Sequence, residues 1–214
     1  MDFFKSKIQG SSDASIGRLT VHHIDPQSLG LSREVYREAR TEKDARATEY
    51  SAIKRALGKD SIVVADGLNY IKGFRYQLYC EAKAVQTPSC VVSDSGARIV
   101  ACGLTSLEVH VGTPIEKCQE INAKLLEDGK SDGGYAKDLF DNLVYRYEEP
   151  NGMTRWDSPL FTVPFDDEAP PFEAIWDAMV GSDGKVKTIK PNLATVTVTR
   201  MDSTNDQCIA EIRL

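Results

Sequence analysis

The sequence predicts an α/β fold in which a parallel sheet is flanked by helices. Short apolar runs alternate along the chain with longer stretches of mixed polarity, as strands and helices alternate in such folds. The clearest strand is Ser61–Ala65, in which four apolar residues follow the serine without interruption. A continuous apolar run of this length indicates a strand buried on both faces, which is typical of parallel sheets.

The first part of the chain predicts a helix, a strand and a longer helix. Residues 3–8 have the pattern of a helix end, because a cluster of glycine and small polar residues follows them. The apolar run 19–24 predicts a strand that stops at Asp25, which a proline follows. Ser32 is a favoured N-cap, and the charged stretch 32–57 predicts a helix, with an interruption near Thr41 as the alternative.

The later elements continue this alternation. Residues 72–84 predict a helix and the apolar run 88–92 predicts a second buried strand. Thr113 and Pro114 are typical of a helix start, since a glutamate three residues after a threonine completes a capping box and proline suits the first helical position. We expect that helix to reach Glu127, and then a helix at 135–147, a strand at 160–163 and a helix at 172–180.

Composition indicates one domain of moderate size. The chain has 214 residues, of which 41% are hydrophobic, enough for one sizeable core. We expect this domain to span residues 1–180, with a polar, disordered tail over 181–214. The net charge of −6 argues against a protein that binds nucleic acid over its whole surface, so any RNA contact needs a local basic patch. No apolar run has the length of a membrane span, so we expect no membrane partner.

The five cysteines are scattered along the chain and include no C-x-x-C pair. This pattern favours a reducing compartment and argues against a zinc site.

Asp66 directly follows the buried strand Ser61–Ala65. Ligands bind at the carboxyl ends of the strands in open parallel sheets. In nucleotide hydrolases an acid at this position holds Mg²⁺. The alternative is that Asp66 and Gly67 only form a turn.

Two long motifs point to a known family. Residues 66–81 read DGLNYIKGFRYQLYCE, and residues 146–151 read RYEEPN before RWDSPLF at 155–161. With these motifs the chain resembles the Elongator-associated killer-toxin-insensitivity family, P-loop ATPases related to the kinase that phosphorylates seryl-tRNA for selenocysteine synthesis. The similarity runs from Asp2 to Val92 and resumes from His110 to Val196.

This resemblance implies a P-loop kinase-like sheet, ATP and Mg²⁺ as cofactors, and the Elongator complex and tRNA as partners. It also implies support of tRNA wobble-uridine modification and a location in cytoplasm and nucleus. Two alternatives stay open. One is a small-molecule or aminoacyl-tRNA kinase, since relatives of the family phosphorylate substrates. The other is a non-catalytic fragment that binds tRNA or protein.

The phosphate-binding loop of the family is missing. The family begins with a strand and a G-x-x-x-x-G-K-[ST] loop, and no such string occurs in this sequence. We therefore expect a chain truncated at its N-terminus that hydrolyses ATP poorly. In sheets of this kind the missing strand lies between those at 61–65 and 88–92, and the apolar run 98–102 is a candidate to take its place.

Residues 93–109 form an atypical insert. Removing them joins Val92 to His110 and restores the spacing of the family, which suggests a translated intron. The alternative is a genuine surface loop.

The resemblance also assigns roles around the expected cleft. Asp66 would hold Mg²⁺. Asp25, at the end of the second family strand, is a candidate general base, or else part of a turn. Asn69 and Tyr70 would line the nucleotide cleft, with packing as the alternative for Tyr70. We expect one of His22 and His23 to be packed and the other exposed, and neither to be a ligand.

Basic residues form a second group of candidates. Lys72 and Arg75 follow the cleft acid and are candidates for contact with nucleotide phosphates or RNA, or they form a solvated helix start. Arg146 and Arg155 lie in the downstream motif and could assist at the phosphates. The basic positions at i, i+4 and i+7 of the expected helix 32–57 would share one face and could meet tRNA, unless neighbouring glutamates pair with them; these are Arg33, Arg37 and Arg40.

Overall fold

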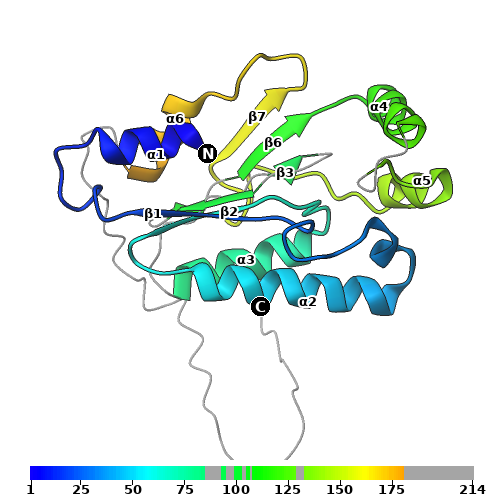
Figure 1. The fold of residues 1–214 in the computed structure, drawn as a ribbon, viewed down its shortest axis with the longest axis horizontal. Coiled ribbons are helices and arrows are strands. Elements are labelled where there is room, and N and C mark those ends of the chain that lie inside the picture. Colours follow the sequence, from blue (N-terminus) through cyan, green and yellow to red (C-terminus); the bar gives the residue numbers. More distant parts are fainter. Residues whose placement is uncertain (85–92, 95–98, 103–104, 107, 129–132, 181–214) are drawn as a thin grey trace, which may run out of the picture.

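Two parallel strands lie at the centre of the molecule, β1 (Thr20–Ile24) and β2 (Ser61–Ala65). The structure is a computed structural model, and it describes residues 1–84, 93–94, 99–102, 105–106, 108–128 and 133–180. In Figure 1, helices α2 (Ala39–Ala56) and α3 (Lys72–Ala84) lie on one side of these strands, and α1 (Asp2–Gln9) and α6 (Phe172–Val180) lie on the other. Helices therefore cover both faces of the sheet, as the sequence predicts.

The first sheet has the order β1-β2-β4-β5. β2 pairs antiparallel with β4 (Ile99–Cys102), and β5 (Thr105–Ser106) continues antiparallel to β4. Residues 99–102 of the expected run thus lie beside β2, where we expected this run to take the place of the missing strand. This edge of the first sheet therefore departs from the parallel pairing of β1 and β2, because β4 runs in the opposite direction to β2.

The second sheet is parallel and has the order β3-β6-β7. It contains β3 (Ser93–Asp94), β6 (Glu108–Gly112) and β7 (Leu160–Pro164). The atypical insert is therefore more than a surface loop, since it supplies strands to both sheets and its last two residues begin the buried strand β6. The strand expected at 88–92 and the tail at 181–214 lie outside the described residues.

Helices α4 (Ile115–Glu127) and α5 (Lys137–Tyr145) lie together at one end of the molecule (Figure 1). The Asn122 side chain of α4 holds the segment just before α5, because its Nδ2 donates to the Tyr135 carbonyl at 2.8 Å and its Oδ1 accepts from the Tyr135 N–H at 2.7 Å. The expected capping box does not form, since the N-cap of α4 is Pro114 and makes no side-chain capping hydrogen bond.

The helix expected at 32–57 is divided into two. A 3₁₀ helix, η1 (Arg33–Arg37), precedes α2, and Glu38 between them is extended, with φ −120° and ψ 138°. The interruption that we considered near Thr41 is therefore present, but it lies at Glu38, three residues before Thr41. It changes the geometry of the three arginines, because Arg40 lies on a different helix from the other two.

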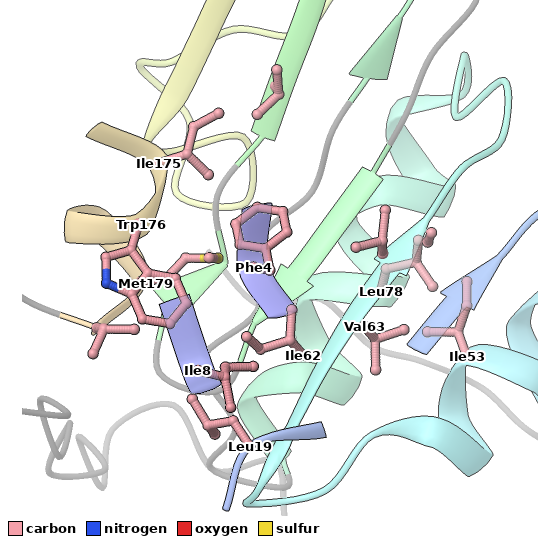
Figure 2. Close-up of a cluster of buried hydrophobic side chains, with 14 of the residues drawn as sticks. Phe4, Ile8, Leu19, Ile53, Ile62, Val63, Leu78, Ile175, Trp176 and Met179 are labelled. Atoms are coloured by element: carbon pink, nitrogen blue, oxygen red, sulfur yellow. The ribbon is translucent and has the colours of Figure 1, made fainter. Parts of the chain in front are cut away.

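The main core is built around β2. All five residues of β2 are buried, and Ile62 and Val63 are completely enclosed. In Figure 2, Ile62 points toward Phe4 and Ile8 of α1, whereas Val63 points to the opposite side, toward Ile53 of α2. Because alternate residues of a strand face opposite sides, only a continuously apolar strand can satisfy helices on both faces.

A second, smaller core cluster supports the loop that follows β2. It joins η1, this loop and α5 through Tyr36, Tyr70, Leu139 and Leu143. In the described part of the chain, no helix is long and apolar enough to cross a membrane.

Candidate functional site

Asp25 and Asp66 emerge side by side at one edge of the sheet. The parallel register pairs Ile24 with Ala65, so the next residue of each strand is an aspartate. The Asp66 N–H donates to the Ile24 carbonyl at 2.7 Å, which holds the two strand ends together. Each carboxylate keeps 18% of its side-chain surface exposed. We call this pair the Asp25–Asp66 edge.

His23 lies between the two acids. Its Nε2 is 2.9 Å from Asp66 Oδ2, and its Nδ1 is 3.5 Å from Asp25 Oδ2. Both histidines of β1 are exposed, so the expectation that one of them is packed is wrong. The sequence contained the signal for this contact, because residues two apart on a strand share a face and His23 precedes Asp25 by two.

Asp25 also forms a turn. Its Oδ1 accepts a hydrogen bond from the Ser28 N–H at 2.8 Å, and the Ser28 hydroxyl donates to the Asp25 carbonyl at 2.8 Å. The two alternatives that the sequence left open are therefore compatible. One carboxylate oxygen stabilises the turn, and the other faces His23 and the site.

A hollow opens beside this edge, between α2 and the ends of β1 and β2. We call it the Glu49 hollow. Its polar lining comes from both strand ends, from the loop after β2 and from α2, and consists of Asp25, Asp66, Asn69 and Glu49. Glu49 and Asn69 also line an adjoining hollow that continues toward the rings of Tyr36 and Tyr70.

Glu49 is the residue of this site that sequence analysis missed. It is 8% exposed, and its one described hydrogen bond comes from the Tyr36 hydroxyl to Oε1 at 3.4 Å. Burial raises the pKa of Glu49 to about 7, against the weaker opposing effects of Tyr36 and the Arg46 charge. Sequence analysis missed Glu49 because it lies in a highly charged helix, where the local sequence does not distinguish a buried glutamate from the solvent-exposed ones.

Asn69 shapes the loop after β2. It has a φ of +43°, in the left-handed region that asparagine tolerates better than most residues. Its side-chain Nδ2 donates to the Gly67 carbonyl at 2.9 Å. Asn69 is 6% exposed and lines both hollows, and its role in a nucleotide cleft stays a prediction.

Tyr70 and Arg146 belong to a buried network around Glu42. The Tyr70 hydroxyl and Arg46 both hydrogen-bond Glu42 Oε1, and Arg146 donates to Glu42 Oε2 at 2.7 Å. Burial favours neutral Glu42, but the hydrogen bonds from Tyr70 and Arg146 outweigh it and lower the pKa of this carboxyl. Burial, and then the Glu42 carboxylate, raise the pKa of the Tyr70 hydroxyl.

In this structure Tyr70 and Arg146, which we expected at the nucleotide, make contacts within the protein. Tyr70 packs in the second core cluster, and Arg146 lies over its ring at 5.4 Å. Arg146 links α2 to the end of α5, and Tyr70 links α2 to the loop after β2. Arg146 keeps 30% of its side chain exposed, but it lines neither hollow.

Arg75 occupies a different place from the one that we expected. It is completely buried on α3, where its guanidinium donates to Asp157 at 2.9 Å and to the carbonyls of Asn69 and Glu148. Glu108 of β6, also fully buried, lies 3.4 Å from the same guanidinium. An enclosed guanidinium presents no N–H group to phosphates or RNA, so this placement does not fit the ligand contact expected from the sequence.

Lys72 and Arg155 are both exposed. The Lys72 backbone N–H donates to Glu148 Oε2 at 2.6 Å, which anchors the start of α3, while its Nζ lies 5.3 Å from the Trp156 ring centre. Arg155 lies in the turn before β7. Neither residue lines the Glu49 hollow.

The three arginines of the expected tRNA surface do not share a helix face. Arg33 lies over the Tyr135 ring at 4.6 Å, and Arg37 pairs with Glu34 at 2.7 Å and Asp138 at 2.5 Å. Arg40, at the start of α2, is exposed. The ion pairing that we considered as the alternative is present at Arg37.

Comparison with known proteins identifies the family. A model of the family described as chromatin associated protein KTI12 matches residues 5–212. The chain belongs to the KTI12 family. It is 43% identical over 173 residues to protein kti12 of Schizosaccharomyces pombe, which covers 81% of this chain and 52% of that protein. Its identity to KTI12 of Saccharomyces cerevisiae is 36% over 163 residues, which covers 76% of this chain and 44% of that protein.

A solved KTI12 structure shares the fold. The crystal structure of Chaetomium thermophilum Kti12, described as a complex with ADP-AlF3, is 41% identical in sequence. It matches with a TM-score of 0.67 over 83% of this chain and 88% of that one. The predicted P-loop kinase-like α/β fold is confirmed. This chain spans about half the length of the curated KTI12 relatives that it matches.

No group of three or more histidines, cysteines or acids in the described residues of this KTI12 chain is arranged to hold a metal by itself. The Asp25–Asp66 edge nevertheless has the donor chemistry of a magnesium site, because Mg²⁺ prefers oxygen ligands and usually takes only one or two carboxylates, with water and phosphates completing its shell.

Proposed function

We propose that this chain is the nucleotide-binding part of a KTI12 ATPase that regulates the Elongator complex and supports tRNA wobble-uridine modification. The observation that carries the proposal is the Asp25–Asp66 edge, where two carboxylates meet at the carboxyl ends of adjacent parallel strands. Sheets of this class bind their ligands at that edge. The complex of the Chaetomium thermophilum relative with ADP-AlF3 supports an adenine nucleotide as the ligand.

Mg²⁺ with ATP fits the residues at this edge. Asp66 is the acid that would hold the ion, directly or through water. Asp25 would accept a proton from the attacking water, or would orient that water. The bound ion would neutralise charge on the phosphates. Asn69 shapes the cleft beside these acids, and Lys72 is an accessible cation at the start of α3.

We expect binding without efficient turnover by a polypeptide of this sequence. No G-x-x-x-x-G-K-[ST] string occurs in it, so it supplies neither the backbone N–H cradle nor the lysine that hold the β- and γ-phosphates in P-loop proteins. The missing string is also the observation that favours the second candidate, a non-catalytic module that binds tRNA or protein.

Equilibrium titration with a fluorescent ADP analogue in the presence of Mg²⁺ tests the main proposal. Saturable, one-to-one binding that unlabelled ADP displaces is the expected result, together with ATP turnover close to the uncatalysed rate. If the folded chain shows no binding at any nucleotide concentration that the method reaches, the non-catalytic alternative replaces the proposal.

Of the three arginines proposed to contact tRNA, Arg40 is the best one to test. Arg40 is exposed at the start of α2, whereas Arg37 is already paired with Glu34 and Asp138. Charge reversal, Arg40→Glu, is expected to weaken tRNA binding and to reduce the slope of log K against log salt by about one. Lys117→Glu, on helix α4, serves as the control. Equal losses in both variants would show that tRNA responds to net charge and not to this position.

A further inference from the structure

Helix α2 buries two glutamates whose surroundings differ. Glu42 and Glu49 are seven residues apart, so they lie on one face of the helix, and they are 4% and 8% exposed. Glu42 is compensated by two arginines and a tyrosine hydroxyl, as described above. Glu49 has only the long hydrogen bond from Tyr36, to Oε1.

The second oxygen of Glu49 is left open toward the hollow. Among the described residues, none donates a hydrogen bond to Oε2. A side chain built on Gly67 would place its first carbon 3.5 Å from this oxygen, so the glycine leaves the space above Oε2 open at the end of β2. A carboxylate oxygen that lines an open hollow is free to accept a hydrogen bond from a group bound there, and a buried glutamate gains most from such a donor.

The lining of the hollow restricts the chemistry of a group bound there. Three carboxylates, those of Asp25, Asp66 and Glu49, face it, and no lysine or arginine lines it among the described residues. Such a lining repels a bare phosphate and favours groups that donate hydrogen bonds or carry positive charge. A hydrated divalent cation does both, since Mg²⁺ keeps several of its waters when one or two carboxylates bind it.

We propose that Glu49 is an outer-sphere ligand of the cation site, whose Oε2 accepts a hydrogen bond from water on a divalent cation held at the Asp25–Asp66 edge. The proposal rests on the proposed function, which places the cation there. Glu49 itself is not a direct ligand, in agreement with the lack of a three-residue metal cluster in the described structure. Tyr36 fixes the other oxygen and thereby orients the carboxylate.

Mn²⁺ is the probe for the test, because electron paramagnetic resonance counts the free ion during titration of the full chain. Loss of an outer-sphere partner typically weakens metal affinity by about tenfold or more, and we expect this loss in Glu49→Gln. Glu81→Gln is the matched control, since Glu81 also accepts from a tyrosine, Tyr50, but lies on α3 away from the hollow. It is expected to bind Mn²⁺ like the wild type.

Glu49→Asp is a second variant, which keeps the charge and withdraws the oxygen by one methylene. It is expected to lose affinity as Glu49→Gln does, and wild-type affinity in either folded variant overturns the role of Glu49. Asp66→Asn shows whether a negative result concerns only the role of Glu49 or also the cation site of the proposed function. If Asp66→Asn abolishes binding while both Glu49 variants bind normally, only the present inference fails. If the wild type itself does not bind Mn²⁺, the cation site and the inference both fail.

Discussion

His23 Nε2 lies 2.9 Å from Asp66 Oδ2, and this contact joins β1 to β2 at the edge where the two acids meet. The same ring faces Asp25 through Nδ1 at 3.5 Å. The imidazole therefore sits between the two carboxylates that would otherwise repel each other across the ends of the strands.

This contact is expected to contribute little to stability. His23 keeps 36% of its side chain exposed, and exposed pairs couple by less than about 1 kcal/mol because water screens them. A double-mutant cycle with His23→Ala and Asp66→Asn, followed by urea unfolding at pH 7, measures the coupling. A coupling energy of several kcal/mol would show that the pair is a structural element, and that substitution of Asp66 is unsuitable for functional tests.

Arg75 is expected to contribute strongly to stability. Replacing it by alanine leaves the carboxylates of Asp157 and Glu108 buried beside each other without their shared cation. Breaking a buried ion pair from one side typically costs about 3–5 kcal/mol, so Arg75→Ala should unfold at much lower urea concentration than the wild type.

Arg155→Ala is the control for Arg75, since Arg155 is exposed in a turn and its loss is expected to change stability by no more than about 0.5 kcal/mol. The opposite pattern, normal stability of Arg75→Ala with loss of nucleotide or tRNA binding, would return Arg75 to the ligand-contacting role predicted from the sequence.

Glu49 should make stability depend on pH. Burial raises its pKa from 4.5 to about 7, so between these values the folded chain holds a proton that the unfolded chain releases. The stability from this group is complete below about pH 4.5 and is lost as the pH rises through 7. The loss is on the order of 3 kcal/mol.

Thermal unfolding of Glu49→Gln between pH 5 and pH 8 measures this effect. The variant is expected to lose less stability over the range than the wild type, because glutamine stays neutral, and Glu81→Gln should follow the wild type. Parallel pH profiles for the wild type and Glu49→Gln would mean that the Glu49 carboxyl is ionised in the folded chain, with a donor that the structure does not show.

Much of the fold could be predicted because it depends on local patterns. β2 and α3 begin and end where the sequence predicts, since a continuous apolar run and a regular helical spacing each define their own limits. The break at Glu38 was harder to place, because the charged stretch around it contains no glycine or proline to mark the end of η1. β6 was missed for another reason, since its first residue, Glu108, is charged and yet lies buried beside Arg75.

In the candidate site, too, the features set by local sequence could be predicted and those set by distant segments could not. Asp66 was predicted from its position at the end of an apolar strand and Asp25 from the family resemblance, and the register of β1 and β2 brings them together. Whether an arginine faces solvent or a buried acid depends on segments that are distant in sequence, as with Arg75 and Asp157. The burial of Glu49 likewise depends on how η1 and the loop after β2 pack over α2, which the helical pattern alone does not contain.

The most direct test of the proposed nucleotide site is the effect of Mg²⁺ on nucleotide affinity in the wild type and in Asp66→Asn. Titrations with a fluorescent ATP analogue, in Mg²⁺ and in EDTA, give this effect for each protein. We expect Mg²⁺ to tighten binding in the wild type and to leave the affinity of Asp66→Asn unchanged, because the acid that holds the ion is then missing. An equal tightening in both proteins would contradict the assignment of Asp66, and with it the site at the ends of β1 and β2.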